Sequence, residues 1–268
     1  MTNQPKLDKE TSKKIEQFHQ NVTTEAEDVI FRVFPSKIFE LQELIASTSS
    51  PSSPFNLSRA KESTDPTVYP PPTVKSEEPD TKKRKLDSVT ANGTRYVELE
   101  HARYPNLLVT NKQLTEAQDI VKRECEKLAE LCDKVRLWIN ISMPRVSISR
   151  YIANIANERH FASGDNFGVQ VQEDVMSELQ RSQDSCYNMR DSARQGHLNR
   201  AKICSKIIKY PHIEDYAIAL KEHDQKHIYF ARQSVIEICN IYAVAMDVLH
   251  KNMIKLRKPK GDNVAGLY

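Results

Sequence analysis

Two histidines four residues apart are the most recognisable arrangement for chemistry in this chain. His223 and His227 stand in the pattern His-Asp-x-x-His, and this spacing puts both imidazoles on one face of a helix, where they could bind a metal ion. No third ligand stands nearby in the sequence. We therefore favour a solvated helix face, and a metal-dependent enzyme that uses the two histidines stays as an alternative.

Other arrangements for catalysis are weaker still. Glu77, Glu78 and Asp80 are close in sequence, but no predicted helix or strand would hold them as an acid–base pair. The chain has no Gly-x-Ser-x-Gly, phosphate-binding loop or Gly-x-Gly-x-x-Gly. Its five cysteines are widely spaced and lack a Cys-x-x-Cys pair, which is typical of reduced packing residues. We predict a protein that is not an enzyme and that uses no metal and no other cofactor.

Composition narrows the class of protein further. The chain has 268 residues, of which 39% are hydrophobic and 28% are charged, as is typical of helical proteins with much surface. No apolar run is long enough to span a membrane, and residues 1–6 lack the apolar core of a signal peptide. The net charge of +3 is too small to indicate nucleic acid as a partner.

Four long amphipathic patterns must position any site. The first fills residues 1–47, with apolar residues from Ile15 to Ile45 at steps of three and four and a bend expected at Pro35. The second begins at residue 111, with Thr110 or Asn111 as its N-cap, and stops before Pro144.

The third and fourth patterns are longer. One runs from about Val171 to Tyr210 and has a polar middle, which predicts a wet face on the outside or along a channel of an oligomer. The other keeps a 3.5-residue period from Ile228 to Leu256 and ends at Pro259. We predict an all-α fold, a four-helix bundle whose long lateral faces favour an oligomer.

The segments between these helices carry the remaining signals. Residues 48–110 are rich in Pro and Ser, which predicts a mobile linker. A basic cluster within it predicts a nuclear import signal, with a solvated charge run and a DNA-contacting arm as the alternatives. The cluster consists of Lys82, Lys83, Arg84 and Lys85.

A turn and an ambiguous stretch separate the second helix from the third. The turn consists of Gly164, Asp165, Asn166, Phe167 and Gly168. Its glycines permit a tight reversal, and Phe167 is either a plug for the end of the bundle or a contact for a partner. Residues 146–163 before it could form one or two helical turns or an elaborate loop. After Gly261 the chain is expected to project as a flexible tail that ends at Tyr268.

Several short motifs, taken in order, resemble one family. They are Thr24-Glu25-Ala26-Glu27-Asp28, Phe34-Pro35-x-Lys37, the basic cluster, Trp138 shortly before Pro144-Arg145, Asp165-Asn166-Phe167-Gly168-Val169, Lys209-Tyr210-Pro211-His212-Ile213-Glu214-Asp215-Tyr216, Leu249-x-Lys251-Asn252 and Leu267-Tyr268. Each motif is weak alone, but their order and spacing are specific, and they cover nearly the whole chain outside the linker. The chain resembles the REG-type proteasome activators and is most similar to the gamma member, which carries the basic linker motif.

The resemblance implies a function and a set of partners. It implies a homoheptameric ring that caps the proteasome core particle and opens its gate without ATP or ubiquitin. In such proteins the tail, here Gly266, Leu267 and Tyr268, enters pockets of the core's α-subunit ring, and the terminal carboxylate meets a lysine. The activation loop near residues 146–169, with the turn 164–168, presses on the gate segments. Arg200 and Lys202 would line the channel, and an import receptor would take the protein to the nucleus.

Two departures from the family pattern stand out. Residues 146–163 lengthen the activation loop by roughly fifteen residues relative to the few that the family has there. Asp165 replaces the first Asn of the usual Asn-Asn-Phe-Gly, so this side chain loses its amide donors, and gate opening could change while docking survives. The remaining alternative is a nuclear coiled-coil scaffold or DNA-associated protein, which would form dimers and whose affinity for duplex DNA would fall steeply with salt.

Overall fold

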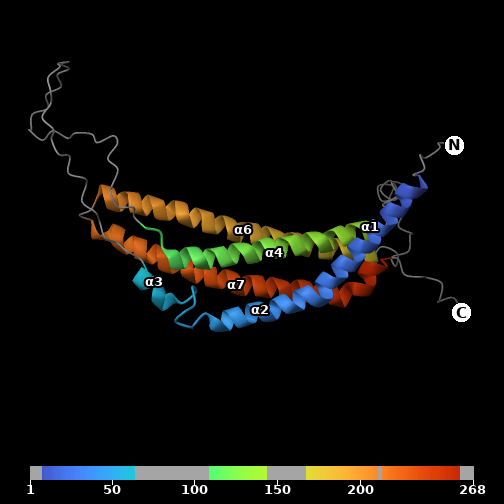
Figure 1. Ribbon diagram of the computed structural model, residues 1–268, viewed down its shortest axis with the longest axis horizontal. Coiled ribbons are helices and arrows are strands. Elements are labelled where there is room, and N and C mark those ends of the chain that lie inside the picture. The colour runs from blue at the N-terminus through green and yellow to red at the C-terminus, as the bar shows by residue number, and fades with distance from the viewer. Residues whose placement is uncertain (1–7, 64–108, 144–166, 211–212, 260–268) are drawn as a thin grey trace, which may run out of the picture.

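The computed structural model describes residues 8–63, 109–143, 167–210 and 213–259. This part of the chain contains helices and no strand. Three long helices, α4 (Lys112–Ser142), α6 (Phe167–Lys209) and α7 (Glu214–Arg257), lie side by side along the molecule (Figure 1). The prediction of an all-α bundle of long helices is confirmed.

The fourth layer of the bundle is built from consecutive shorter helices. It consists of α1 (Lys9–Asp28), the π-helix η1 (Val29–Val33) and α2 (Phe34–Ser47). Here α1 packs on α4, whereas α2 packs on α7. A short helix, α3 (Leu57–Ser63), covers α7 and the start of α4.

The π-helix explains how the first pattern passes Pro35. A proline inside a helix has no N–H to donate, and its ring clashes with the carbonyl four residues earlier, which here is that of Phe31. The wider π-helical turns of η1 precede it directly, and the helix axis changes direction between α1 and α2 (Figure 1). The bend expected at Pro35 is present and begins one turn earlier.

The periodic stripes of α4 and α7 form the core. Every apolar residue of the two predicted rows is buried, including Cys125 and Cys132, and Asn252 is half-buried. Trp138 is also buried beside the α4 row. Burial stabilises by roughly 1.5–3 kcal/mol for each large aliphatic side chain. Asn111 caps α4, because its Oδ1 accepts from the backbone N–H of Leu114 at 3.0 Å.

Two sequence-based predictions about the N-terminal region need correction. The predicted linker starts too early, because residues 48–63 form turns and α3, and Phe55 is completely buried. Gln113 fastens this segment by donating to the carbonyls of Pro54 and Asn56, both at 2.9 Å. The apolar row predicted for residues 15–45 also includes exposed residues, since Phe18 is 50% and Phe39 is 65% exposed. The basic cluster at 82–85 lies outside the described residues.

Candidate functional site

Three helix ends meet at one end of the bundle. Helix α4 ends there at Ser142, α6 begins there at Phe167, and α7 ends there at Arg257 (Figure 1). These residues are the points from which the predicted activation loop and the predicted tail leave the described bundle. The bundle therefore holds the roots of both segments next to each other.

The start of α6 touches the end of α7 through backbone atoms. Gly168 is buried, and a Cβ added to it would lie 1.9 Å from the carbonyl oxygen of Pro259 and 2.7 Å from its Cα. The backbone of Gly168 is helical, so glycine is needed here for space and not for a positive φ. No larger residue fits without movement of one of the two backbones.

A buried side chain makes a second link between the same helices. The amide of Gln172 donates to the carbonyl oxygen of Leu256 at 3.0 Å, and the Gln172 side chain is fully buried. This carbonyl is one of the last four of α7, which have no partner inside their own helix. On the other side, the Nε of Arg257 lies 2.8 Å from a carboxylate oxygen of Glu27. The end of α7 is thus held from α6 and from α1.

Of the residues predicted for the activation loop and the tail, two lie in α6 and the others lie outside the described residues. Phe167 and Gly168 were assigned to an exposed turn, but both belong to the first turn of α6, four residues before the expected start. The turn prediction is wrong for these two because the helix reaches back to meet Pro259. Gly164, Asp165 and Asn166, and the tail residues Gly266, Leu267 and Tyr268, lie outside the described residues.

Arg200 is not a channel-lining residue. Its side chain is buried between α6 and α7, where its Nε lies 3.0 Å from Oδ1 of Asp224. The prediction was wrong because the polar middle of α6 was treated as solvent-facing, whereas this position faces a buried carboxylate. Lys202, two residues further on, is exposed, and its place in a channel stays a prediction.

Asp224 is the centre of this buried polar network. Burial acts to raise the pKa of its carboxyl, but hydrogen bonds from His223, Arg200 and Asn111 outweigh burial and lower the pKa to about 2. The Nδ2 of Asn111 donates to Oδ2 of Asp224 at 2.9 Å. The network therefore joins α4, α6 and α7 at the end of the bundle opposite to the helix ends described above.

The two histidines of the His-Asp-x-x-His pattern belong to this network. Nδ1 of His223 lies 3.3 Å from Oδ1 of Asp224, and the rings of His223 and His227 lie 4.3 Å apart between centroids. Burial and nearby positive charge lower the pKa of His227 to about 4. Within the described ranges, no group of three or more His, Cys, Asp or Glu residues is placed to hold a metal ion. The solvated face was also the wrong expectation for His223, which is largely buried.

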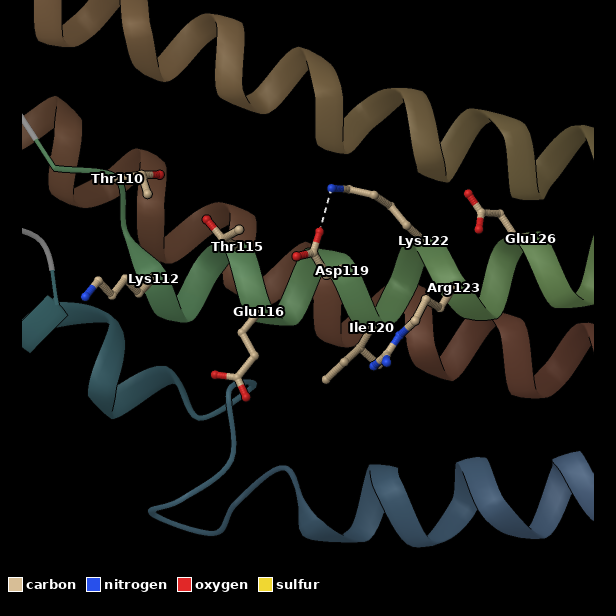
Figure 2. A pocket seen from close by; sticks show the side chains of 9 residues that line it. All are labelled: Thr110, Lys112, Thr115, Glu116, Asp119, Ile120, Lys122, Arg123 and Glu126. Carbon is tan, nitrogen blue, oxygen red and sulfur yellow. Dashed lines mark hydrogen bonds and ion pairs between the residues drawn. The ribbon is translucent and has the colours of Figure 1, made fainter.

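A groove of about 740 Å³ runs along the outer side of α4. Figure 2 shows its lining, which comes entirely from α4 and the residues just before it, with an ion pair of 2.8 Å between Lys122 and Asp119. Glu116 extends toward the segment between α2 and α3 and Arg123 lies beside Ile120, whereas Asp119 and Lys122 extend toward α6. The groove mixes both signs of charge along one helix and gathers no single kind of chemistry.

Comparison with protein families finds matches for an N-terminal and a C-terminal part of the chain. The sequence profile described as "Proteasome activator PA28, N-terminal" matches residues 9–67, and the one described as "Proteasome activator PA28, C-terminal" matches residues 107–266. The chain belongs to the PA28 family of proteasome activators. The resemblance seen in the ordered motifs is thereby confirmed.

Individual PA28 relatives are similar over most or nearly all of the chain. "Proteasome activator complex subunit 3" of Homo sapiens is 30% identical over 272 residues, which cover 98% of each protein. "Proteasome activator 28" of Dictyostelium discoideum is 28% identical over 187 residues, 70% of this chain and 73% of that protein.

Solved structures share the fold. The 11S subunit PA28 of Plasmodium falciparum has a TM-score of 0.68 at 24% identity, with 97% of this chain and 99% of that chain covered. PA26, solved in complex with an archaeal 20S proteasome, has a TM-score of 0.60 at 11% identity, with 94% and 99% covered. In the described part of this PA28 chain, no helix is long and apolar enough to cross a membrane.

Two buried polar residues, one at each end of the bundle, could have been recognised from the sequence. Gln172 stands four residues after Gly168 and three before Val175, on the buried face of α6. Asp224 likewise stands between Leu220 and Ile228 on the buried face of α7. A polar residue on an apolar stripe requires a buried partner, and these two positions could have been singled out on that ground.

Proposed function

We propose that this PA28 chain acts as a non-catalytic regulator that docks on the ends of the proteasome core particle as a homoheptameric ring. Gly266, Leu267 and Tyr268 would enter pockets of the core's α-subunit ring, and the activation loop, with the turn 164–168, would displace the gate segments. Peptides would then reach the core's own catalytic sites without ATP or ubiquitin.

One observation carries this proposal. The described bundle brings the start of α6, where the activation loop ends, against the end of α7, where the tail begins, through the contact of Gly168 with Pro259. A loop and a tail that leave from one end of a rigid bundle can reach the same face of a partner. The long lateral helix faces leave room for neighbouring subunits around a ring.

A ring makes weak tails effective. One short peptide tail binds its pocket weakly, but seven tails on one rigid ring bind together at high effective concentration. The experiment is the hydrolysis of a short fluorogenic peptide by the core particle, titrated with the full-length protein or with a variant that lacks Leu267 and Tyr268. We expect strong stimulation by the first and none by the second. Equal stimulation by both would refute docking through the tail.

We also propose that the basic cluster Lys82, Lys83, Arg84 and Lys85 binds a nuclear import receptor and places the protein in the nucleus. Four adjacent positive charges in a Pro- and Ser-rich segment support this proposal. Replacing all four by Ala is expected to abolish nuclear accumulation in cells and to leave stimulation of the core unchanged. Unchanged nuclear accumulation would contradict this part of the proposal.

A further inference from the structure

We propose that Gly168 and Gln172 are positioning residues that lock the end of α7 to the start of α6, so that docking of the tail is converted into opening of the gate. We call the contacts of Gly168 with Pro259 and of Gln172 with Leu256 the tail-root clamp. The inference rests on the proposed function, because it assigns a role to contacts between the roots of the two segments that act on the core particle.

The Gly168 contact fixes the spacing of the two backbones. The missing side chain lets the carbonyl of Pro259 approach so closely that a Cβ would lie 2.6 Å from its carbonyl carbon. The atoms in the way belong to a backbone and cannot rotate aside as a flexible side chain could. Any side chain at position 168 therefore pushes the root of the tail away from α6.

The Gln172 contact fixes the register along the helices. Its amide reaches a carbonyl of the last turn of α7, and both Gln172 and Leu256 are completely buried. Val175 and Met253 are buried nearby in the same apolar core. A sliding movement of α7 along α6 would break this hydrogen bond in a place where water cannot replace it.

The end of α7 also has a contact with a helix other than α6. The ion pair of Arg257 with Glu27 joins the last residue of α7 to α1. The end of α7 therefore contacts both α6 and α1, and these two helices fix the point from which the chain leaves the bundle. The tail begins from a fixed point relative to the residue at which the activation loop ends.

Docking and gate opening place different demands on this clamp. Tyr268 is the ninth residue after Pro259, and a fully extended chain of nine residues spans about 30 Å. Such a tail can still reach its pocket when its root moves by a few ångströms. The turn 164–168 at the end of the activation loop has no such reserve, because it joins α6 directly and its last two residues belong to that helix. A loosened clamp should therefore spare binding and impair gate opening.

The test titrates full-length rings against the core particle and follows peptide hydrolysis to saturation. Gly168→Ala is compared with Gly196→Ala, a matched change in the same helix, where the three atoms nearest to the added Cβ all belong to the side chain of His227 and not to a backbone. We expect Gly168→Ala to lower maximal stimulation at least fivefold while the half-saturating concentration changes less than threefold. Gly196→Ala should keep the maximal stimulation of the parent protein.

A second variant keeps the test decisive if Gly168→Ala does not fold. Gln172→Met keeps an unbranched side chain of similar length and removes only the donor to Leu256. It should also lower the maximum more than it changes half-saturation, with the native mass of the ring unchanged. If Gly168→Ala or a folded Gln172→Met reaches the parent maximum, or changes only half-saturation, the clamp does not couple docking to the gate. If the parent protein itself does not stimulate, the proposed function fails instead.

Discussion

Arg200 and Asp224 form an ion pair inside the protein, with 3.0 Å between Nε and Oδ1 and almost no exposure of either side chain. The pair joins the C-terminal part of α6 to the N-terminal part of α7, and Asn111 extends it to the cap of α4. The charges in this part of PA28 thus serve the packing of the bundle.

Removing one member of this ion pair should lower the free energy of unfolding strongly. In Asp224→Ala the guanidinium of Arg200 stays buried without its carboxylate, so we expect a loss of about 3–5 kcal/mol in the free energy of unfolding. Urea unfolding at one fixed protein concentration measures it. The exposed pair of Lys251 and Asp247 is the control, and Asp247→Ala should cost about 1 kcal/mol or less. Similar losses in the two variants would contradict the structural role of Asp224.

The pH dependence of stability should reveal the lowered pKa of His227. His227 has its pKa lowered from 6.5 to about 4, so between these pH values the unfolded chain binds the proton and the folded chain does not. Stability is therefore complete above pH 6.5 and falls as the pH decreases toward 4. The other charged or titratable groups that act on His227 are His223, Lys226, Asp224 and His197, and the parent protein and the variant share them.

The check is the melting temperature of the parent protein and of His227→Gln between pH 7.5 and 4.5. The variant lacks the titrating ring, so its melting temperature should fall less over this interval. Parallel curves for the two proteins would show that His227 does not carry the effect.

The segment that follows α2 offers a test of packing. Phe55 is fully buried in the main apolar core, whereas Phe39 is 65% exposed on α2. We expect Phe55→Ala to lower the free energy of unfolding by about 3–5 kcal/mol, because it leaves a cavity. Phe39→Ala should change it by about 0.5 kcal/mol or less. A small effect of Phe55→Ala in urea unfolding would mean that residues 48–63 are not part of the folded unit.

Asp165 allows a test of the activation loop that starts from the sequence. The family usually has Asn at this position, and Asp lacks the amide donors. Asp165→Asn should raise the maximal stimulation of the core and leave the half-saturating concentration unchanged. A shift of half-saturation alone would assign this residue to docking.

The long helices could be predicted from the sequence, because the buried face of a helix requires apolar residues at regular spacing. The rows of α4 and α7 predict the core residue by residue, and Pro144 and Pro259 mark helix ends correctly. Phe55 and Ala60 left no such trace, because two buried residues in a Ser- and Pro-rich stretch have no period.

Long-range contacts were hidden for a different reason. That Arg200 meets Asp224, and that Gly168 meets Pro259, depends on how α6 and α7 are aligned, which no local pattern encodes. Much of the polar middle of α6 is exposed, as the predicted wet face requires, but Gln183 is buried there and donates to the carbonyl of Ala129. Helix existence follows from local spacing, whereas the partner of a buried polar residue follows only from the assembled bundle.

The most direct measurement for the central claim is native mass spectrometry of the full-length protein, alone and mixed with the proteasome core particle. The account predicts a particle of seven times the 30.8 kDa chain mass and, in the mixture, core particles that carry one or two such rings. Removal of Leu267 and Tyr268 should abolish the complex with the core and leave the free ring intact. Only single chains or dimers, with no species bound to the core, would contradict the account.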